Sequence, residues 1–247
     1  MIFLIFCQIA LAESLFSNDF YDLAIVEYKR LFFFDSASNK DLQLRLHYTI
    51  ACVNQDFYKG YEEADRLLKD FFEIDNESRL ILSKALIKNG YYGIAIDILK
   101  PTKEIKLLGL CYLFNHQYLN ALDEFQKVDE GIYREVKEFV RRPEKSITRA
   151  MLFSAILPGS GEVYAGNIKQ GLHDFSLTFL SAFLLYNSMK NKKYVDAGLI
   201  FSFLFNRFYF GSISNSARIA REHNEKLEKK WLCNIKNRYF TDWQFNQ

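Results

Sequence analysis

Four polar side chains within a strongly apolar segment are the residues of this chain best suited to chemistry. They are His173, Asp174, Asp196 and Arg207. In an apolar setting such groups could serve an enzyme or a transporter component, or pair with one another across helices. Glu162, just before the segment, adds a fifth ionisable group. Their spacing matches neither a nucleophile with its base nor a set of metal ligands, so we expect no catalysis, no metal and no cofactor.

Two other motif classes are excluded on spacing. The glycine-rich run from Pro158 to Gly166 lacks the Gly-Lys-Ser/Thr ending of a phosphate-binding loop, and no predicted strand precedes it. The four cysteines form no CxxC pair and no zinc-binding pattern. Cys52 and Cys111 fall on predicted helix faces, where cysteine packs as a small hydrophobe.

Composition predicts a helical protein with ample core material. Hydrophobic residues make up 49% of the 247 residues and aromatics 17%, while only three prolines interrupt the chain. A net charge of +2 provides no attraction for nucleic acid, and the basic clusters lie beside hydrophobic segments. Lipid is therefore an expected partner and nucleic acid is not.

The first twelve residues are predicted to be an export signal. They form an apolar run that ends in Ala10-Leu11-Ala12, the small-x-small pattern of a signal peptidase site, and Glu13 follows. These twelve residues contain no Lys or Arg, and the run is short. The alternative is a first helix that packs into the next domain.

Residues 13–140 show helical periodicity with internal similarity. A polar turn, an aromatic residue and an amphipathic helix recur at Tyr21, Tyr58, Tyr92 and Tyr118. A helix pair of this kind cannot bury its apolar face alone, so neighbouring pairs must stack.

The last copy carries a family resemblance. Gly109 and Ala121 are small, which lets two antiparallel helices approach closely, and Tyr112, Tyr118 and Phe125 fill the space toward the next pair. At these spacings the segment resembles the tetratricopeptide repeat family, in a degenerate form. The resemblance implies an all-α domain whose curved surface binds a protein or peptide partner. A plain helical bundle without a partner is the alternative.

Residues 146–226 are predicted to form a hydrophobic helical hairpin domain. Ser146 is a candidate N-cap, and Pro158 is expected to end the helix that begins near Ile147. Two apolar stretches follow, Leu172–Met189 and Tyr194–Ile213, each near the length that spans a bilayer. A basic loop containing Lys190, Lys192 and Lys193 joins them.

Charges constrain how this hairpin meets lipid. Those at the ends of the stretches can reach the interface, whereas Arg207 is expected to face the hairpin interior or the interface, with Asp174 or Asp196 as its partner. Because apolar residues occupy nearly every face, lipid is expected to cover the excess. A soluble protein with a buried hairpin is the alternative.

The turn before the hairpin carries a second resemblance. Its matching residues are Pro158, Gly159, Gly161, Glu162, Tyr164 and Gly166. They resemble the Pro-Gly-x-Gly-(Gln/Glu)-x-Tyr-x-Gly turn of a bacterial membrane domain of unknown function, often found behind a signal peptide and tetratricopeptide-like repeats. We expect Gly159 and Gly161 to adopt positive φ, Gly166 and Gly171 to allow close backbone contact, and Glu162 to cap the following helix.

These patterns together predict a membrane-anchored protein-interaction scaffold of the bacterial cell envelope. The basic loop is expected on the cytoplasmic side and the repeat domain in the periplasm. Residues 227–247 form a tail whose aromatics, among them Trp231 and Trp243, are expected to pack on the protein or at an interface. The alternatives are a soluble exported structural protein and an accessory component of a transporter or enzyme.

Overall fold

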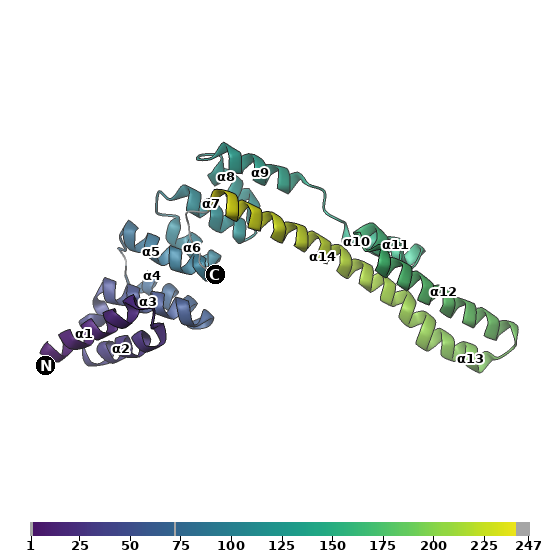
Figure 1. The fold of residues 1–247 in the computed structure, drawn as a ribbon, viewed down its shortest axis with the longest axis horizontal. Coiled ribbons are helices and arrows are strands. Elements are labelled where there is room, and N and C mark those ends of the chain that lie inside the picture. The colour runs from purple at the N-terminus through teal and green to yellow at the C-terminus, as the bar shows by residue number, and fades with distance from the viewer. Residues whose placement is uncertain (1, 72, 241–247) are drawn as a thin grey trace. The chain divides into compact units, whose positions relative to one another are not determined.

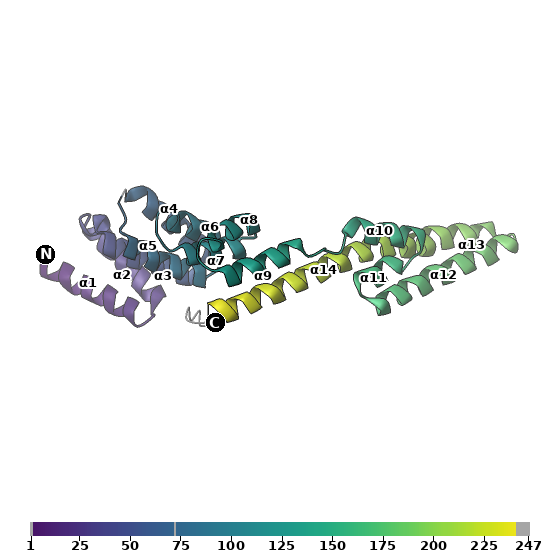
Figure 2. The ribbon, with the colours of Figure 1, turned by 90° about the horizontal axis from the view of Figure 1, so that it is seen from above.

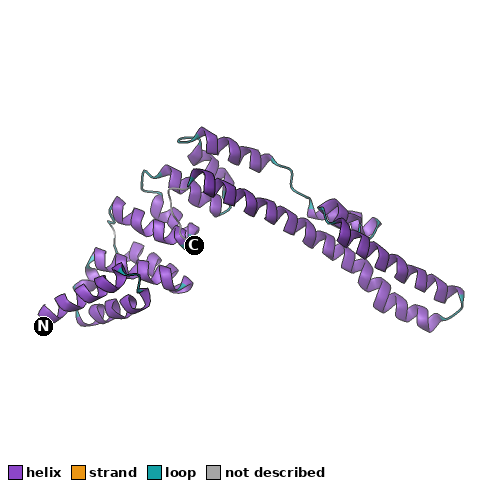
Figure 3. Ribbon diagram, in the orientation of Figure 1, coloured by secondary structure: helices purple, strands orange, loops and turns teal. Residues whose placement is uncertain are grey.

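The computed structural model describes residues 2–71 and 73–240, and every regular element in those ranges is helical (Figure 3). The predicted all-α class is therefore confirmed. The chain divides into two compact units, one ending at Val140 and one beginning at Arg141.

The first unit is a succession of short helices, most of which pack against the next helix in the chain (Figure 1). Its elements are α1 (Ile2–Ser17), α2 (Tyr21–Phe34), the 3₁₀ turn η1 (Ser38–Lys40), α3 (Leu42–Gln55), α4 (Phe57–Asp70), α5 (Asn76–Lys88), α6 (Tyr92–Leu99), α7 (Ile105–Phe114), α8 (Tyr118–Phe125) and α9 (Glu130–Arg141). Helices α3, α4 and α5 begin at aspartates, Asp41, Asp56 and Asp75, whose carboxylates accept amide hydrogens of the first turn.

The predicted aromatic turns coincide with helix starts. Tyr21, Tyr92 and Tyr118 are the first residues of α2, α6 and α8. In each case the residue two positions earlier has a positive φ, namely 61° at Asp19, 80° at Gly90 and 58° at His116. A residue in the left-handed conformation thus reverses the chain at the same position before three of the four predicted copies.

Helix α1 includes the predicted signal segment. It runs without a break through Ala12 and Glu13, and the Ala12 side chain is fully buried in a core shared with Tyr28 and Leu31. The Glu13 carboxylate accepts a hydrogen bond of 2.7 Å from the Tyr28 hydroxyl and lies 2.9 Å from Nδ1 of His47. This is the packed first helix of the sequence-based alternative; cleavage after Ala12 stays a prediction.

The second unit comprises α10 (Ile147–Ile156), α11 (Ser160–Ala165), α12 (Ile168–Lys190), α13 (Tyr194–Leu199), the π-helical segment η2 (Ile200–Phe205) and α14 (Asn206–Tyr239). Helix α12 lies alongside the run formed by α13, η2 and α14, while α10 and α11 pack on α14 (Figures 1 and 2). Helix α14 continues through the predicted start of the tail to Tyr239, and Trp243 lies outside the described residues.

Candidate functional site

The turn between α10 and α11 is built where three helix backbones meet. Ser146 caps α10 through a bond from the Arg149 amide, as predicted, and α10 ends at Ile156, two residues before Pro158. Gly159 has φ of 90°, and a Cβ there would lie 2.1 Å from the Gly171 carbonyl oxygen. Only glycine fits both the conformation and the contact.

The other motif glycines exchange their predicted roles. Gly161 lacks a positive φ but packs so closely that a Cβ would lie 2.0 Å from the Ala150 carbonyl oxygen. Gly166 has φ of 101° and its Cβ position is open, with His223 no closer than 3.6 Å. Gly171 makes the predicted close contact, since its Cβ would lie 2.5 Å from the Gly159 oxygen. Gly161 therefore serves packing and Gly166 serves the helix end.

Glu162 lies at the centre of this crossing. Its side chain is fully buried and accepts hydrogen bonds from the hydroxyls of Ser154, at 2.7 Å, and Ser212, at 3.0 Å. It caps no helix: α11, whose first turn contains Glu162, has Gly159 at its N-cap position and no side-chain cap, and α12 is capped by Asn167. The capping prediction is wrong because Glu162 points into the interior, where burial raises the pKa of its carboxyl group.

Asp174 forms the second half of the same polar cluster. Its carboxylate accepts bonds from the amides of Gln170, at 2.8 Å, and Asn215, at 2.9 Å, and lies 3.1 Å from Nδ1 of His173. Asp174 is buried, whereas the His173 side chain is 63% exposed. Glu162 bonds to Ser212 and Asp174 bonds to Asn215, so the two carboxyl groups are held beside positions one helical turn apart on α14.

The other two predicted polar residues lie apart from this cluster. Asp196 and Arg207 are exposed, and neither forms an ion pair or hydrogen bond within the described part of the chain. The predicted pairing of Arg207 with an aspartate is wrong. Arg207 lies two positions, or about 200° of helix, from both Phe205 and Tyr209, which lie on the half-buried side. It therefore points outward.

Tyr164 and Asn224 secure the start of the unit. The Tyr164 hydroxyl accepts a bond of 3.2 Å from the Ser146 amide, and the Lys145 ammonium lies 4.9 Å from the centre of the Tyr164 ring. Asn224 exchanges two bonds of 3.0 Å with the Lys145 backbone. The backbone at the start of α10 is therefore held by Tyr164 of the motif and by Asn224 of α14.

The interior of the second unit is small and polar, while its outside is large and apolar. Its buried polar residues on α10, α12 and α14 are Ser154, Asp174, Thr178, Ser181, Ser212 and Ser216. We call the large exposed apolar residues between positions 172 and 210 the apolar belt: Leu172, Phe175, Phe179, Leu180, Phe183, Leu184, Tyr186, Met189, Tyr194, Val195, Leu199, Phe201, Phe203, Leu204 and Phe210. Across residues 2–71 and 73–240, no helix combines the length and the apolarity needed to cross a membrane.

Sequence reasoning missed most of the polar partners of Glu162 and Asp174. Ser154, Gln170, Ser212 and Asn215 come from three helices and meet only in the folded unit. A signal was nevertheless present, because Asp174, Thr178 and Ser181 follow helical spacing within an otherwise apolar stretch. Such a stripe marks the face that packs inward.

The predicted repeat-packing residues meet between α7 and α8 in the first unit. A Cβ on Gly109 would lie 2.7 Å from the Phe125 ring, and Ala121 and Phe125 are fully buried. Tyr118 packs edge-on against Phe139, with ring centres 6.0 Å apart. Cys52 and Cys111 are buried as predicted, and burial raises the pKa of the Cys111 thiol to about 12.

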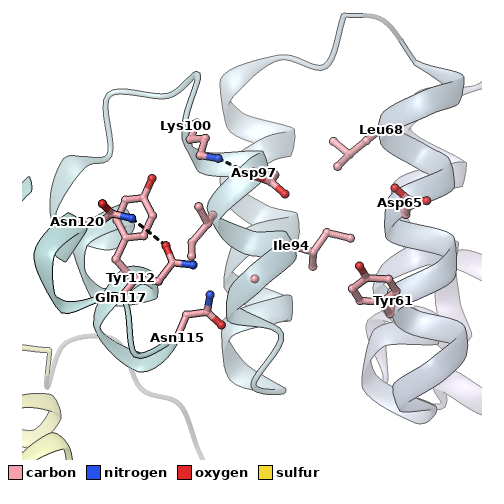
Figure 4. Close-up of a pocket in the computed structure, with 12 residues that line it drawn as sticks. Tyr61, Asp65, Leu68, Ile94, Asp97, Lys100, Tyr112, Asn115, Gln117 and Asn120 are labelled. Carbon is pink, nitrogen blue, oxygen red and sulfur yellow. Dashed lines mark hydrogen bonds and ion pairs between the residues drawn. The ribbon is translucent and has the colours of Figure 1, made fainter.

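Tyr112 lines a groove in the first unit rather than its core (Figure 4). The groove has a volume of about 410 Å³ and is formed by α4, α6, α7 and α8. Its polar lining includes Asp65, Asp97, Asn115, Gln117 and Asn120. Figure 4 shows the amides on one wall and Asp65 on the opposite one.

The groove polar groups are only partly satisfied within the protein. The Lys100 ammonium pairs with Asp97 at 2.9 Å, and the Asn120 amide donates to Gln117 at 3.0 Å. The side chain of Asn115 has no hydrogen-bond partner in the described ranges. Its amide is therefore available to a ligand.

No known protein family matches this chain, and no curated protein or solved structure is significantly similar to it.

Proposed function

We propose that this protein is a membrane-anchored interaction scaffold of the bacterial cell envelope. The second unit would be the anchor, a hydrophobic helical hairpin held in lipid by the apolar belt. The first unit, with its tetratricopeptide-like helix pairs, would hold a protein or peptide partner on the outer side of the membrane. The proposal involves no catalysis.

The inverted burial of the second unit is the observation that carries the anchor. A soluble helical unit buries its large apolar residues, because transfer from water contributes about 1.5–3 kcal/mol per side chain. Here Phe179, Phe183 and Phe203 are 65%, 58% and 68% exposed, whereas Ser181 and Ser212 are buried. Small and polar residues between helices, with large apolar ones outside, are typical of helices packed within lipid.

Charges limit how deeply the anchor can enter lipid. Lys190, Lys192 and Lys193 lie at one end of α12, and His173 lies near the other. The 18 residues of Leu172–Met189 cover roughly 27 Å as a helix, close to the thickness of the hydrocarbon layer. Arg207 is exposed and lies eight residues before Asn215, the residue that bonds to Asp174, so its long side chain would have to extend along the helix to reach the interface.

Removing three exposed phenylalanines should release the protein from membranes. The wild type is expected to stay in the membrane pellet after alkaline carbonate extraction. Changing Phe179, Phe183 and Phe203 together to serine should lower membrane partitioning by about a thousandfold or more, since each ring contributes about 1.5–3 kcal/mol in lipid. These side chains are exposed, so the fold should be retained.

A matched control is available in the first unit. Phe20, Phe33 and Phe34 are 55%, 83% and 73% exposed and can be changed to serine in the same way. That variant should remain in the pellet. A wild-type protein found in the soluble fraction would contradict the anchor and favour the soluble structural alternative.

The groove of the first unit supports the partner-binding half of the proposal. Its volume lies in the range of ligand sites, and amide side chains can pair with the backbone of an extended peptide. Asp65 and Asp97 already pair with Lys69 and Lys100, so recognition of a partner would depend on the amide side chains of the groove.

Changing both Asn115 and Asn120 to alanine should reduce partner recovery after mild crosslinking by about 5- to 150-fold, because each of the two lost hydrogen bonds is worth about 0.5–1.5 kcal/mol. Gln55→Ala, which removes an exposed amide at the end of α3 outside the groove, is the control and should recover the wild-type amount. Equal recovery from all three proteins would place the binding surface elsewhere.

A further inference from the structure

The crossing of α11 and α12 brings two acidic groups onto one stripe of α14. The helices touch at Gly159 and Gly171, and Glu162 and Asp174 each lie three residues, about one helical turn, further along. Glu162 bonds to Ser212, and Asp174 bonds to Asn215, one turn later on α14. Both carboxyl groups are buried, and their partners on α14 lie one turn apart, so the two groups are neighbours in the interior of the unit.

The serine hydrogens around Glu162 have a defined direction. Ser154 Oγ accepts the Gly161 amide hydrogen at 3.1 Å, and Ser212 Oγ accepts that of Gly159 at 2.9 Å. Each hydroxyl is thereby free to donate to Glu162, and both do. Glu162 and Asp174 each accept hydrogen bonds from two neutral donors, which are hydroxyls for Glu162 and amides for Asp174. Asp174 differs in that it also lies beside the imidazole of His173.

No permanent cation balances these two groups among the described residues. Helix α10 presents Ser154 and carries its only charged group, Arg149, on the exposed side. On α14, Tyr209 donates to the Ala155 carbonyl, and Arg207 and Arg218 are exposed. Helix α12 adds only His173 beside Asp174, with Lys169 exposed. On α11 itself, the Tyr164 hydroxyl is bonded to Ser146.

Two adjacent carboxylates cannot both ionise in such a setting, because burial and mutual repulsion both oppose the second charge. We propose that Glu162 and Asp174 form a proton-binding site that holds one proton at neutral pH, with the Glu162 carboxyl donating to the Asp174 carboxylate. The proton then joins α11 to α12, and the surrounding serines and Asn215 join both to α10 and α14. His173, which is bonded to Asp174 and exposed to solvent, is the route of exchange.

The sign of the pH dependence follows from the raised pKa of Glu162. When the pH lies above 4.5, the ordinary pKa of this carboxyl group, and below its raised pKa, the folded unit keeps a proton that the unfolded chain releases. Unfolding therefore becomes more favourable as pH rises through this window, by up to tenfold in the unfolding constant per pH unit. Glu162→Gln keeps an amide donor for Asp174 and has no proton to lose, so its stability should depend less on pH by this amount.

Infrared spectroscopy of the purified full chain tests the proton directly. The folded wild type at pH 7 should show the C=O stretch of a protonated carboxyl group, which Glu162→Gln removes and Glu162→Asp shifts. Asp174→Asn should also remove it, since the new amide can donate to an ionised Glu162. A folded wild type without a protonated carboxyl band at pH 7 would overturn the proposal, even if the Gln variant failed to fold. A Glu162→Gln protein with the wild-type pH dependence would overturn it as well.

Discussion

Gly161→Ala should destabilise the second unit by about 3 kcal/mol or more, at or beyond the upper end of the range for overpacked interiors. The new methyl group would lie 2.0 Å from the Ala150 carbonyl oxygen, 2.6 Å from Ser154 Oγ and 2.8 Å from Ser216 Cβ. The first of these is a backbone atom, so no side-chain rotation relieves the overlap. Helix α11 would have to move away from α10 and α14 together.

Gly211→Ala is the matched control for this prediction. Gly211 lies in α14 next to Ser212, and nothing lies within 4 Å of its Cβ position. Alanine is favoured over glycine in a helix by about 1 kcal/mol, so this variant should be as stable as the wild type or more so. Thermal unfolding with hydrogen exchange of α10 and α11 measures both. Equal exchange in the two variants would mean that the helices do not meet as closely as described.

The local elements of the second unit were predictable because their causes are local. Ser146 begins α10 and Pro158 follows its end, since capping and the missing proline amide act within one turn. The sequence also allowed a close helix contact rich in glycine to be predicted. Which glycine serves packing and which ends a helix was not predictable, because the Ala150 contact of Gly161 joins different helices.

The polar cluster was beyond local prediction for the same reason. Glu162 and Ser212 are 50 residues apart, and only the packing of α11 on α14 brings them together. Gly161 lets α11 pack closely against α10 and α14, so the neighbouring Glu162 side chain is buried between helices and does not lie at a helix end. Arg207 was misplaced because apolar residues surround it in sequence on every side, which hides the face of α14 that packs inward.

The inverted burial of the second unit explains why the glycines and the proposed proton site occur together. Between helices covered by lipid or apolar surface, close backbone approach and hydrogen bonds must supply the attraction that a large apolar core supplies elsewhere. Gly159, Gly161 and Gly171 provide the approach. Glu162 and Asp174, with their neutral donors, provide the bonds. An ionised pair would weaken the same contacts, so the unit needs both features together.

Phe125→Ala should cost the first unit about 3–5 kcal/mol, as expected when a fully buried phenylalanine is removed and a cavity remains. Gly109→Ala should also destabilise, by about 1–3 kcal/mol, because its methyl group would lie 2.7 Å from the Phe125 ring. Gly93→Ala in α6 is the control, since its Cβ position is open, and it should be neutral or stabilising. Hydrogen exchange in α7 and α8 reports each effect.

The double variant Gly109→Ala with Phe125→Leu separates a specific contact from general damage. Leucine is smaller than phenylalanine, so it leaves room for the alanine methyl group that the ring excludes. The double variant should therefore be more stable than the sum of the two single changes predicts, by about 0.5–3 kcal/mol, the range for residues in contact. Additive effects would mean that Gly109 and Phe125 do not meet. The tetratricopeptide-like interpretation of this unit would then lose its support, because it depends on close packing of this helix pair.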